Sequence, residues 1–147
     1  MKFWINNILT IFNTSNSSSK KRKEFPINQI LVIDDEVPIL NMLKLMLTRI
    51  GFLVDTAESG KEGIKKINSN KYALILTDIK MPGISGNQIL HFLKNEKKSP
   101  IPVVGMSGTP WLLDQNDFDA VLSKPCSMKE ILSVINHLIT ESVKYQQ

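Results

Sequence analysis

From residue 29 onward, short apolar runs alternate with longer segments in which apolar residues recur at helical spacing. The first run, residues 30–33, is continuous and rich in β-branched side chains, which is typical of a strand buried on both faces. Similar runs predict four further strands, at residues 52–57, 72–77, 102–106 and 120–123. The chain is therefore expected to contain five strands separated by helices.

The segments between the predicted strands carry signals for helix starts and ends. After the first strand, Pro38 suits a first helical turn and Gly51 is typical of a helix end. Another helix is expected from about residue 86 to residue 97, after a break at residues 81–83. Two pairs have the spacing of capping boxes and predict further starts, Ser59 with Glu62 and Ser127 with Glu130. The apolar positions expected to face the core are Ile39, Leu40, Leu43, Leu47, Ile50, Ile64, Ile67, Ile89, Leu90, Leu93, Ile131, Leu132, Ile135, Leu138 and Ile139.

This alternation of strands and helices predicts βαβ units and one parallel sheet. Right-handed crossovers then place helices on both faces of the sheet. In such α/β folds, ligands bind outside the carboxyl ends of the strands, near the switch in strand order. Functional residues are therefore expected directly after each strand.

Charged and hydroxyl side chains follow four of the five predicted strands. Along the chain these residues are Asp34, Asp35, Asp78, Ser107 and Lys124. Carboxylates held close together repel one another unless a cation neutralises them, and a few carboxylates with room for water suit Mg²⁺. With Mg²⁺, an ammonium group and a hydroxyl group nearby, a carboxylate can attack a phosphoryl group. Alone, each residue could be an ordinary turn or cap residue; their combination indicates a phosphoryl-transfer site.

Residues 1–28 differ from the rest of the chain in composition. They hold five basic residues and one acidic residue, whereas the remaining residues hold 13 of each, so the formal net charge of +4 belongs to this segment. The basic balance is therefore no argument for binding nucleic acid. We expect a flexible basic tail at 1–28 and one folded domain at 29–147. An open alternative is that an amphipathic segment and a basic cluster rest on an anionic membrane surface, namely Trp4, Ile5, Ile8, Leu9, Phe12 and residues 20–23.

Two further features concern the cellular compartment. No apolar run approaches the roughly 20 residues that a membrane-spanning helix needs. The single cysteine, Cys126, excludes an internal disulfide and suits a reducing cytosol. We therefore expect a cytoplasmic protein.

The motifs at the strand ends resemble those of the response-regulator receiver family of two-component signalling, in its chemotaxis-regulator-like form. They are Ile30-Leu31-Val32-Ile33-Asp34-Asp35-Glu36, Thr77-Asp78-Ile79-Lys80-Met81-Pro82-Gly83, Gly86, Met106-Ser107-Gly108 and Lys124-Pro125. The resemblance covers about residues 29–140. It implies a flavodoxin-like (βα)5 fold, with a doubly wound five-stranded parallel sheet of strand order 2-1-3-4-5.

The resemblance also assigns roles to the residues at the strand ends. Asp78 is implied to be the phosphoacceptor, Ser107 to bind a phosphoryl oxygen, and Lys124 to pair with the phosphate. The Lys124–Pro125 peptide is expected to be cis. The implied ligands of Mg²⁺ are Asp34, Asp35, Asp78 and the backbone carbonyl of Lys80. The implied donor is a sensor histidine kinase or a histidine phosphotransfer protein, and a downstream protein is expected to receive the signal by contact.

The sequence departs from the family pattern in two places. The position three residues before the conserved lysine often holds an aromatic switch residue in the family, but here it is Val121. The segment between Ser107 and Lys124 is several residues short, so a shortened fourth helix is expected there. Trp111 in that segment either fills the core or is exposed as a partner contact. Both departures concern how phosphorylation would be communicated to a partner.

Three other functions are alternatives to a phosphorylated single-domain receiver. A flavodoxin-like electron carrier needs a phosphate-binding loop after the first strand, where Asp34 and Asp35 would repel the phosphate of FMN. An aspartyl-phosphate phosphatase needs a second Asp two residues after its nucleophile, but Val37 stands two residues after Asp35. A degenerate receiver, acting as a phosphorylation-independent interaction module, stays open. Beyond self-phosphorylation and autodephosphorylation, no enzyme activity is expected.

Overall fold

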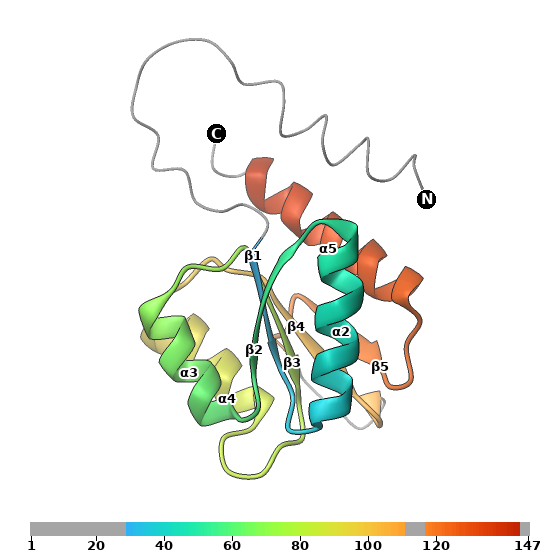
Figure 1. Ribbon diagram of the computed structural model, residues 1–147. Coiled ribbons are helices and arrows are strands. Elements are labelled where there is room, and N and C mark those ends of the chain that lie inside the picture. The colour runs from blue at the N-terminus through green and yellow to red at the C-terminus, as the bar shows by residue number, and fades with distance from the viewer. Residues whose placement is uncertain (1–28, 111–116, 145–147) are drawn as a thin grey trace.

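The computed structural model describes residues 29–110 and 117–144, and this part of the chain forms five strands and four helices (Figure 1). In chain order they are β1 (Gln29–Ile33), α2 (Val37–Ile50), β2 (Leu53–Ala57), α3 (Gly60–Ser69), β3 (Leu74–Asp78), α4 (Gly86–His91) with a π-helical extension (Phe92–Glu96), β4 (Val103–Ser107), β5 (Ala120–Ser123) and α5 (Met128–Lys144). All strands are parallel and lie in the order β2-β1-β3-β4-β5. The predicted flavodoxin-like order 2-1-3-4-5 is confirmed.

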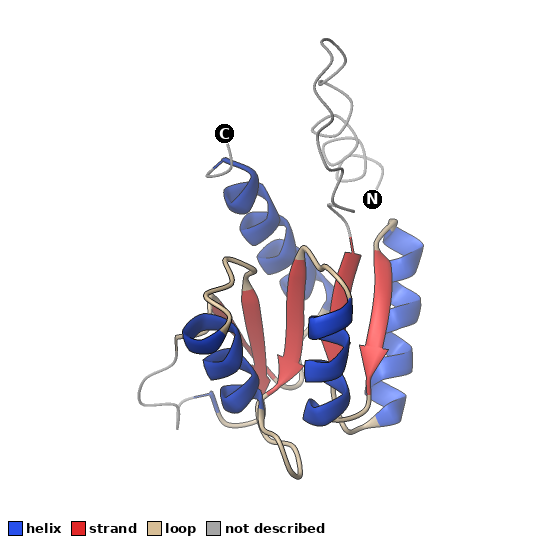
Figure 2. Ribbon diagram, turned by 90° about the vertical axis from the view of Figure 1, so that its left-hand side faces the viewer, coloured by secondary structure: helices blue, strands red, loops and turns tan. Residues whose placement is uncertain are grey.

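Helices cover both faces of the sheet (Figures 1 and 2). Helices α2 and α5 share one core cluster with the sheet, in which Leu47 and Ile135 are completely buried. Helices α3 and α4 share the other cluster, which includes Ile67 and Ile89. Strands β3 and β4 are buried along their whole length, as the continuous apolar runs predicted. This burial on both faces fixes the carboxyl ends of the central strands, where the candidate site lies.

The strand boundaries differ from the predicted ones by one or two residues. Three strands start later than predicted, at Leu53, Leu74 and Val103. Phe52 precedes β2 because its backbone N–H donates to the carbonyl of Leu47 at 3.1 Å, which closes α2 after the left-handed residue Gly51. At the other end, β3 and β4 extend to Asp78 and Ser107. These two residues are therefore the last residues of strands and not the first residues of loops.

The two predicted capping boxes form to different degrees. At α5, Ser127 Oγ accepts from the backbone of Glu130 at 3.2 Å, and the Glu130 carboxylate accepts from the backbone of Ser127 at 2.7 Å. At α3, Ser59 Oγ accepts from Glu62 N at 3.2 Å, but the Glu62 carboxylate accepts from Glu58 N at 2.9 Å. The second half of that predicted box is therefore wrong, because the carboxylate reaches one residue further back. A third box, not recognised in the sequence, is formed by Ser85 and Gln88.

The helix expected at residues 86–97 is present, but its last turn is π-helical. The backbone N–H of Lys97 donates to the carbonyl of Phe92 at 3.0 Å, five residues back. Lys98 then adopts a left-handed conformation, with φ of 49°, and ends the helix. An αL residue after a helix is usually glycine, so a lysine with this conformation is not a typical sign of a helix end.

Several expectations fall on parts of the chain outside the described residues. They concern the basic tail at residues 1–28 and the shortened fourth helix with Trp111, since residues 111–116 are not described. These expectations stay predictions. In the described ranges, every helix is too short or too polar to span a lipid bilayer.

Candidate functional site

The carboxyl ends of four strands bring the predicted site residues to one edge of the sheet. Asp34 directly follows β1, Asp78 ends β3, Ser107 ends β4 and Lys124 directly follows β5. The candidate ligand oxygens of Asp34, Asp35 and Asp78 all lie within 4.8 Å of one another. Residues separated by up to 90 positions therefore form one acidic cluster with a lysine beside it.

Asp34 lies at the bottom of this cluster and is completely inaccessible to solvent. Its backbone N–H donates to the carbonyl of Ala57 at the end of β2, at 3.1 Å. Its Oδ1 accepts from the backbone N–H of Glu36 at 2.9 Å, and its Oδ2 accepts from Lys124 Nζ at 2.8 Å. Asp34 therefore stabilises the turn after β1 and also belongs to the acidic cluster, so the two roles predicted from the sequence are compatible.

Lys124 reaches across the site from the end of β5. Its Nζ lies 2.8 Å from Asp34 Oδ2, 3.4 Å from Asp78 Oδ1 and 3.7 Å from Glu36 Oε1. Its backbone N–H donates to the carbonyl of Ser107 at 2.7 Å, which ties it to the end of β4. The Lys124–Pro125 peptide is cis, as expected from the resemblance. One ammonium group therefore contacts two of the clustered carboxylates and a third at the rim.

The electrostatics of the cluster shift the pKa of both Asp78 and Lys124. Burial raises the pKa of the Asp78 carboxyl; the Lys124 charge lowers it, and the charges of Asp34 and Asp35 raise it, so that the result lies above the ordinary value. Burial lowers the pKa of Lys124, but its bonds and attraction to Asp34 and Asp78 outweigh burial and raise it. Lys124 therefore stays charged, whereas the ionised form of Asp78 is disfavoured.

The remaining predicted residues lie at the rim and in an adjoining loop. Asp35 is exposed at the mouth of the site. Ser107 is only 2 % exposed, and its Oγ accepts from the backbone N–H of Thr109 at 3.1 Å, which leaves the hydroxyl hydrogen available to donate. Lys80 lies two residues after Asp78 in the connection to α4, with its side chain in solvent.

Two residues of the site were not assigned a role from the sequence. Glu36 contributes a carboxylate near Lys124, and its place in an acidic triplet after β1 was the signal that could have indicated this. Thr77 is completely buried, and its hydroxyl donates to the carbonyl of Asp78 at 2.9 Å. A threonine in a buried strand is too common for the sequence to have indicated that contact.

The chemistry of the cluster fits a divalent cation. The candidate ligand atoms are all oxygens, which Mg²⁺ and Ca²⁺ prefer. In the cluster of three carboxylates with Lys124, two negative charges are left without a counter-charge. Because the three Asp side chains come from one edge of the sheet, the opposite side of an ion would remain open for water and a phosphoryl group.

Comparison with known proteins gives a consistent result. The chain matches the family model described as the response regulator receiver domain over residues 30–136. It is 32% identical over 114 residues to the transcriptional regulatory protein ResD of Bacillus subtilis (strain 168), which covers 76% of this chain and 48% of ResD. It is 30% identical over 116 residues to the response regulator ArlR of Staphylococcus aureus (strain Mu50 / ATCC 700699), which covers 77% of this chain and 53% of ArlR. The chain thus spans about half the length of these curated relatives.

Solved structures of similar chains share the fold. The response regulator TrrA of Thermotoga maritima, in complex with Mg²⁺-BeF, is 32% identical with a TM-score of 0.68, covering 76% of this chain and 98% of TrrA. A response regulator receiver domain protein of Clostridium thermocellum is also 32% identical, with a TM-score of 0.70, covering 80% of this chain and 98% of that chain. With a family match over residues 30–136 and this fold, the chain belongs to the response regulator receiver domain family of two-component signalling.

Proposed function

We propose that Asp78 is the phosphoacceptor of this receiver domain. One observation carries the proposal: the ligand oxygens of Asp34, Asp35 and Asp78 lie within 4.8 Å of one another, beside the Lys124 ammonium. Such a cluster is unfavourable without further positive charge, so its presence supports a site that binds a cation. Asp78 is the member that lies at the centre of the sheet edge, at the end of β3.

Mg²⁺ is the proposed cation of this site. Its protein ligands would be Asp34, Asp35, Asp78 and the backbone carbonyl of Lys80. When bound, the ion would supply positive charge to the oxygens of the transferring phosphoryl group. The Mg²⁺-BeF complex of the similar protein TrrA supports this choice of ion.

The proposed donor is a phosphohistidine of a sensor histidine kinase or of a histidine phosphotransfer protein. In the transfer, the P–N bond to the imidazole breaks and a carboxylate oxygen of Asp78 forms the new P–O bond. The imidazole already carries a proton on its other ring nitrogen, so it leaves as a neutral group. Lys124 would pair with the phosphoryl group through the ammonium that now lies 3.4 Å from Asp78, and Ser107 would donate its hydroxyl hydrogen to a phosphoryl oxygen. Positioning and charge carry most of phosphoryl transfer, so this small set of groups is sufficient.

The proposed output is contact with a downstream protein. Hydrolysis of the aspartyl phosphate at the same site would reset the domain, and no separate substrate is proposed. The proposal includes the division of the chain into a basic tail at 1–28 and a receiver domain at 29–147, and a cytoplasmic location.

Intact-mass spectrometry after incubation with acetyl phosphate and Mg²⁺ tests the acceptor. We expect the wild-type protein to gain one phosphoryl group and Asp78→Asn to gain none. Asp117→Asn is a matched control, because Asp117 is exposed ahead of β5 and should leave labelling unchanged. Equal labelling of wild type and Asp78→Asn would reject the acceptor. If neither acetyl phosphate nor a phosphorylated phosphotransfer protein labels the wild type, the domain is better described as a phosphorylation-independent interaction module.

A further inference from the structure

The site loop, residues 79–85 between Asp78 and α4, touches the first residue of α3 at very short range. A Cβ atom added to Gly60 would lie 2.2 Å from the backbone oxygen of Ile84 and 2.8 Å from its Cβ. Carbon atoms in proteins essentially never approach this closely, so only glycine can occupy this position while the loop stays where it is. Gly60 therefore sets how closely the site loop approaches α3.

The other end of the site loop is held at its base. The backbone N–H of Gly86 donates to the carbonyl of Ile79 at 3.0 Å, which closes the loop on itself. A Cβ on Gly86 would lie 2.4 Å from the carbonyl oxygen of Asp78, so here too the backbones are in direct contact. Because the loop is fixed where Gly86 contacts Asp78 and Ile79, it can change position mainly at Ile84, where it contacts Gly60. Lys80 lies between these two points.

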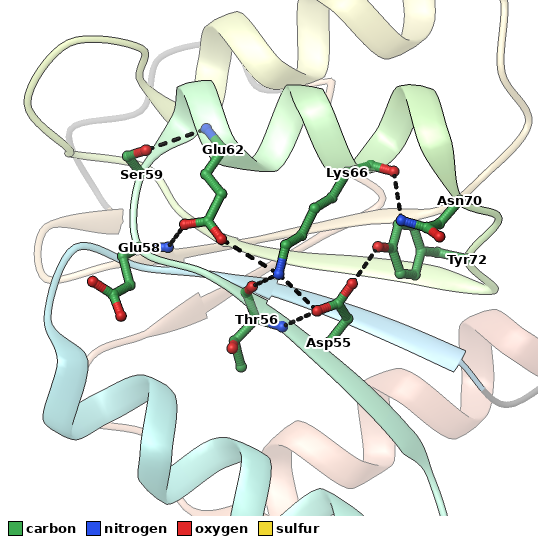
Figure 3. A network of polar contacts seen from close by, with 8 residues as sticks. All are labelled: Asp55, Thr56, Glu58, Ser59, Glu62, Lys66, Asn70 and Tyr72. Atoms are coloured by element: carbon green, nitrogen blue, oxygen red, sulfur yellow. Dashed lines mark hydrogen bonds and ion pairs between the residues drawn. The ribbon is translucent and has the colours of Figure 1, made fainter.

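The corner between β2 and α3 that carries Gly60 is itself held by polar contacts (Figure 3). Ser59 Oγ accepts from the backbone N–H of Glu62 at 3.2 Å, and the Glu62 carboxylate accepts from the backbone N–H of Glu58 at 2.9 Å. Glu58 and Ser59, which precede Gly60, are therefore both bonded to Glu62, which follows it. The corner cannot yield without breaking these bonds.

A second set of contacts in the same network joins α3 to β2 (Figure 3). Lys66 Nζ lies 2.8 Å from Asp55 Oδ1 and 3.3 Å from Glu62 Oε1. Tyr72 Oη donates to Asp55 Oδ2 at 2.7 Å. Burial raises the pKa of Asp55, but the hydrogen bonds from Lys66 and Tyr72 lower it below its ordinary value. Asp55 is therefore charged at neutral pH. These contacts hold α3 against β2 and reach its first turn through Glu62, so this turn acts as a fixed support for the site loop.

We infer that Gly60 is a positioning residue for the metal site: it acts through Ile84 to set the place of the site loop, and so of the Lys80 carbonyl. The inference rests on the proposed function, since it assumes that this carbonyl is a ligand of Mg²⁺. Mg²⁺ requires nearly ideal octahedral geometry, with ligand distances of about 2.0–2.1 Å. Gly60→Ala would force the contact with Ile84 to open from 2.2 Å to at least 3.0 Å, which such geometry cannot absorb.

The test compares Gly60→Ala with Gly51→Ala. Both replace a glycine at a helix end, but Gly51 follows α2 with φ of 115° and has nothing within 4 Å of an added Cβ. Calorimetric titration with Mg²⁺ should show affinity weakened about 10-fold in Gly60→Ala, in the range found for residues that support metal ligands. In Gly51→Ala we expect a lower melting temperature and unchanged affinity. Amide hydrogen exchange of the metal-free proteins should be faster in residues 79–85 of Gly60→Ala alone.

The outcomes separate this inference from the proposed function. If the wild type binds Mg²⁺ and Gly60→Ala binds it equally well, the positioning role is rejected while the proposed function stands. If the wild type does not bind Mg²⁺, both are rejected. If Gly60→Ala does not fold, Ile84→Gly replaces it: this removes the Cβ that faces Gly60 and the side chain that packs on the α3 and α4 cluster, and it frees the loop backbone, so Mg²⁺ binding should weaken several-fold. Unchanged affinity in Ile84→Gly would then overturn the inference.

Discussion

Replacing the buried carboxylate of Asp78 with a neutral amide should stabilise the metal-free domain. Asp78→Asn keeps the shape of the side chain but removes its charge. The side chain of Asp78 is 9% exposed and lies within 4.8 Å of the ligand oxygens of Asp34 and Asp35. Without a metal ion, the wild-type fold must hold this charge next to two others of the same sign. The variant does not.

The size of the effect follows from the distances in the site. At 4.8 Å and an effective dielectric constant of about 20, two like charges repel by about 3.5 kcal/mol. On the same scale, Lys124 at 3.4 Å attracts Asp78 by about 5 kcal/mol, so the two repulsions exceed the attraction by about 2 kcal/mol. Because Asp35 is exposed and its charge is screened, we expect Asp78→Asn to raise the free energy of unfolding by about 1–2 kcal/mol.

The pH dependence of this gain has a definite sign. The pKa of Asp78 is raised in the folded state, so its ionisation costs stability as the pH rises through that raised value. Below the ordinary value of 3.8, both the folded and the unfolded chain are protonated at this residue and the cost disappears. The difference in the free energy of unfolding between Asp78→Asn and the wild type should therefore be largest at neutral pH and should disappear as the pH falls.

Urea denaturation in EDTA measures this difference, with Asp117→Asn as the control for an exposed Asp to Asn change. A gain of 1 kcal/mol corresponds to a rise of about 4 °C in melting temperature for a domain of this size. Saturating Mg²⁺ should reverse the order, because the wild type gains more from binding than the variant. If Asp78→Asn is less stable than the wild type in EDTA at neutral pH, repulsion between the three carboxylates does not destabilise the metal-free domain.

Three further predictions concern the rest of the domain. Tyr72→Phe should lower the free energy of unfolding by about 1–2 kcal/mol in urea at neutral pH, because it removes a 2.7 Å hydrogen bond to the Asp55 carboxylate. Burial and Asp55 raise the pKa of Tyr72 above its ordinary value of 10.0. The tyrosine therefore ionises first in the unfolded chain, and the wild type loses stability as the pH rises above 10.0. An equal loss of stability in Tyr72→Phe at alkaline pH would contradict this assignment. Leu43→Ala, at a position 1% exposed, should cost about 3 kcal/mol in urea while leaving the Mg²⁺ affinity unchanged, and a midpoint equal to that of the wild type would refute it. Deleting residues 1–28 should leave the melting temperature of the domain unchanged, and a large drop would show that this segment contributes to the fold.

The convergence of the site could be predicted because it follows from the topology. A parallel sheet has all its carboxyl ends at one edge, so Asp34, Asp78, Ser107 and Lys124 had to meet once five strands were recognised. The strands themselves were visible because central strands buried on both faces need continuous apolar runs. The coarse fold and the members of the acidic cluster were therefore accessible from the sequence.

The finer contacts depend on distances that no local pattern encodes. The approach of Gly60 to Ile84 joins residues from two different crossovers, and a glycine at a helix start gives no sign of what lies opposite. The carboxylate of Glu62 accepts from the backbone N–H of Glu58 and not from that of Ser59, which the capping pattern alone does not predict. The π-helical turn ends at Glu96, and the left-handed residue that follows it is Lys98, a residue type that seldom marks a helix end. Such details follow from tertiary packing.

The Lys66 side chain that joins α3 to Asp55 of β2 also covers part of the edge of the sheet. Strand β2 is one of the two edge strands of the sheet, and carbonyl groups alternate in direction along a strand. The carbonyl of Ala57 faces β1, where it accepts from Asp34, so that of Thr56 faces outward, and there the Lys66 ammonium covers it (Figure 3). A lysine on a strand edge discourages a foreign strand from adding to it. The same side chain that joins α3 to β2 is therefore expected to disfavour the addition of a foreign strand at this edge.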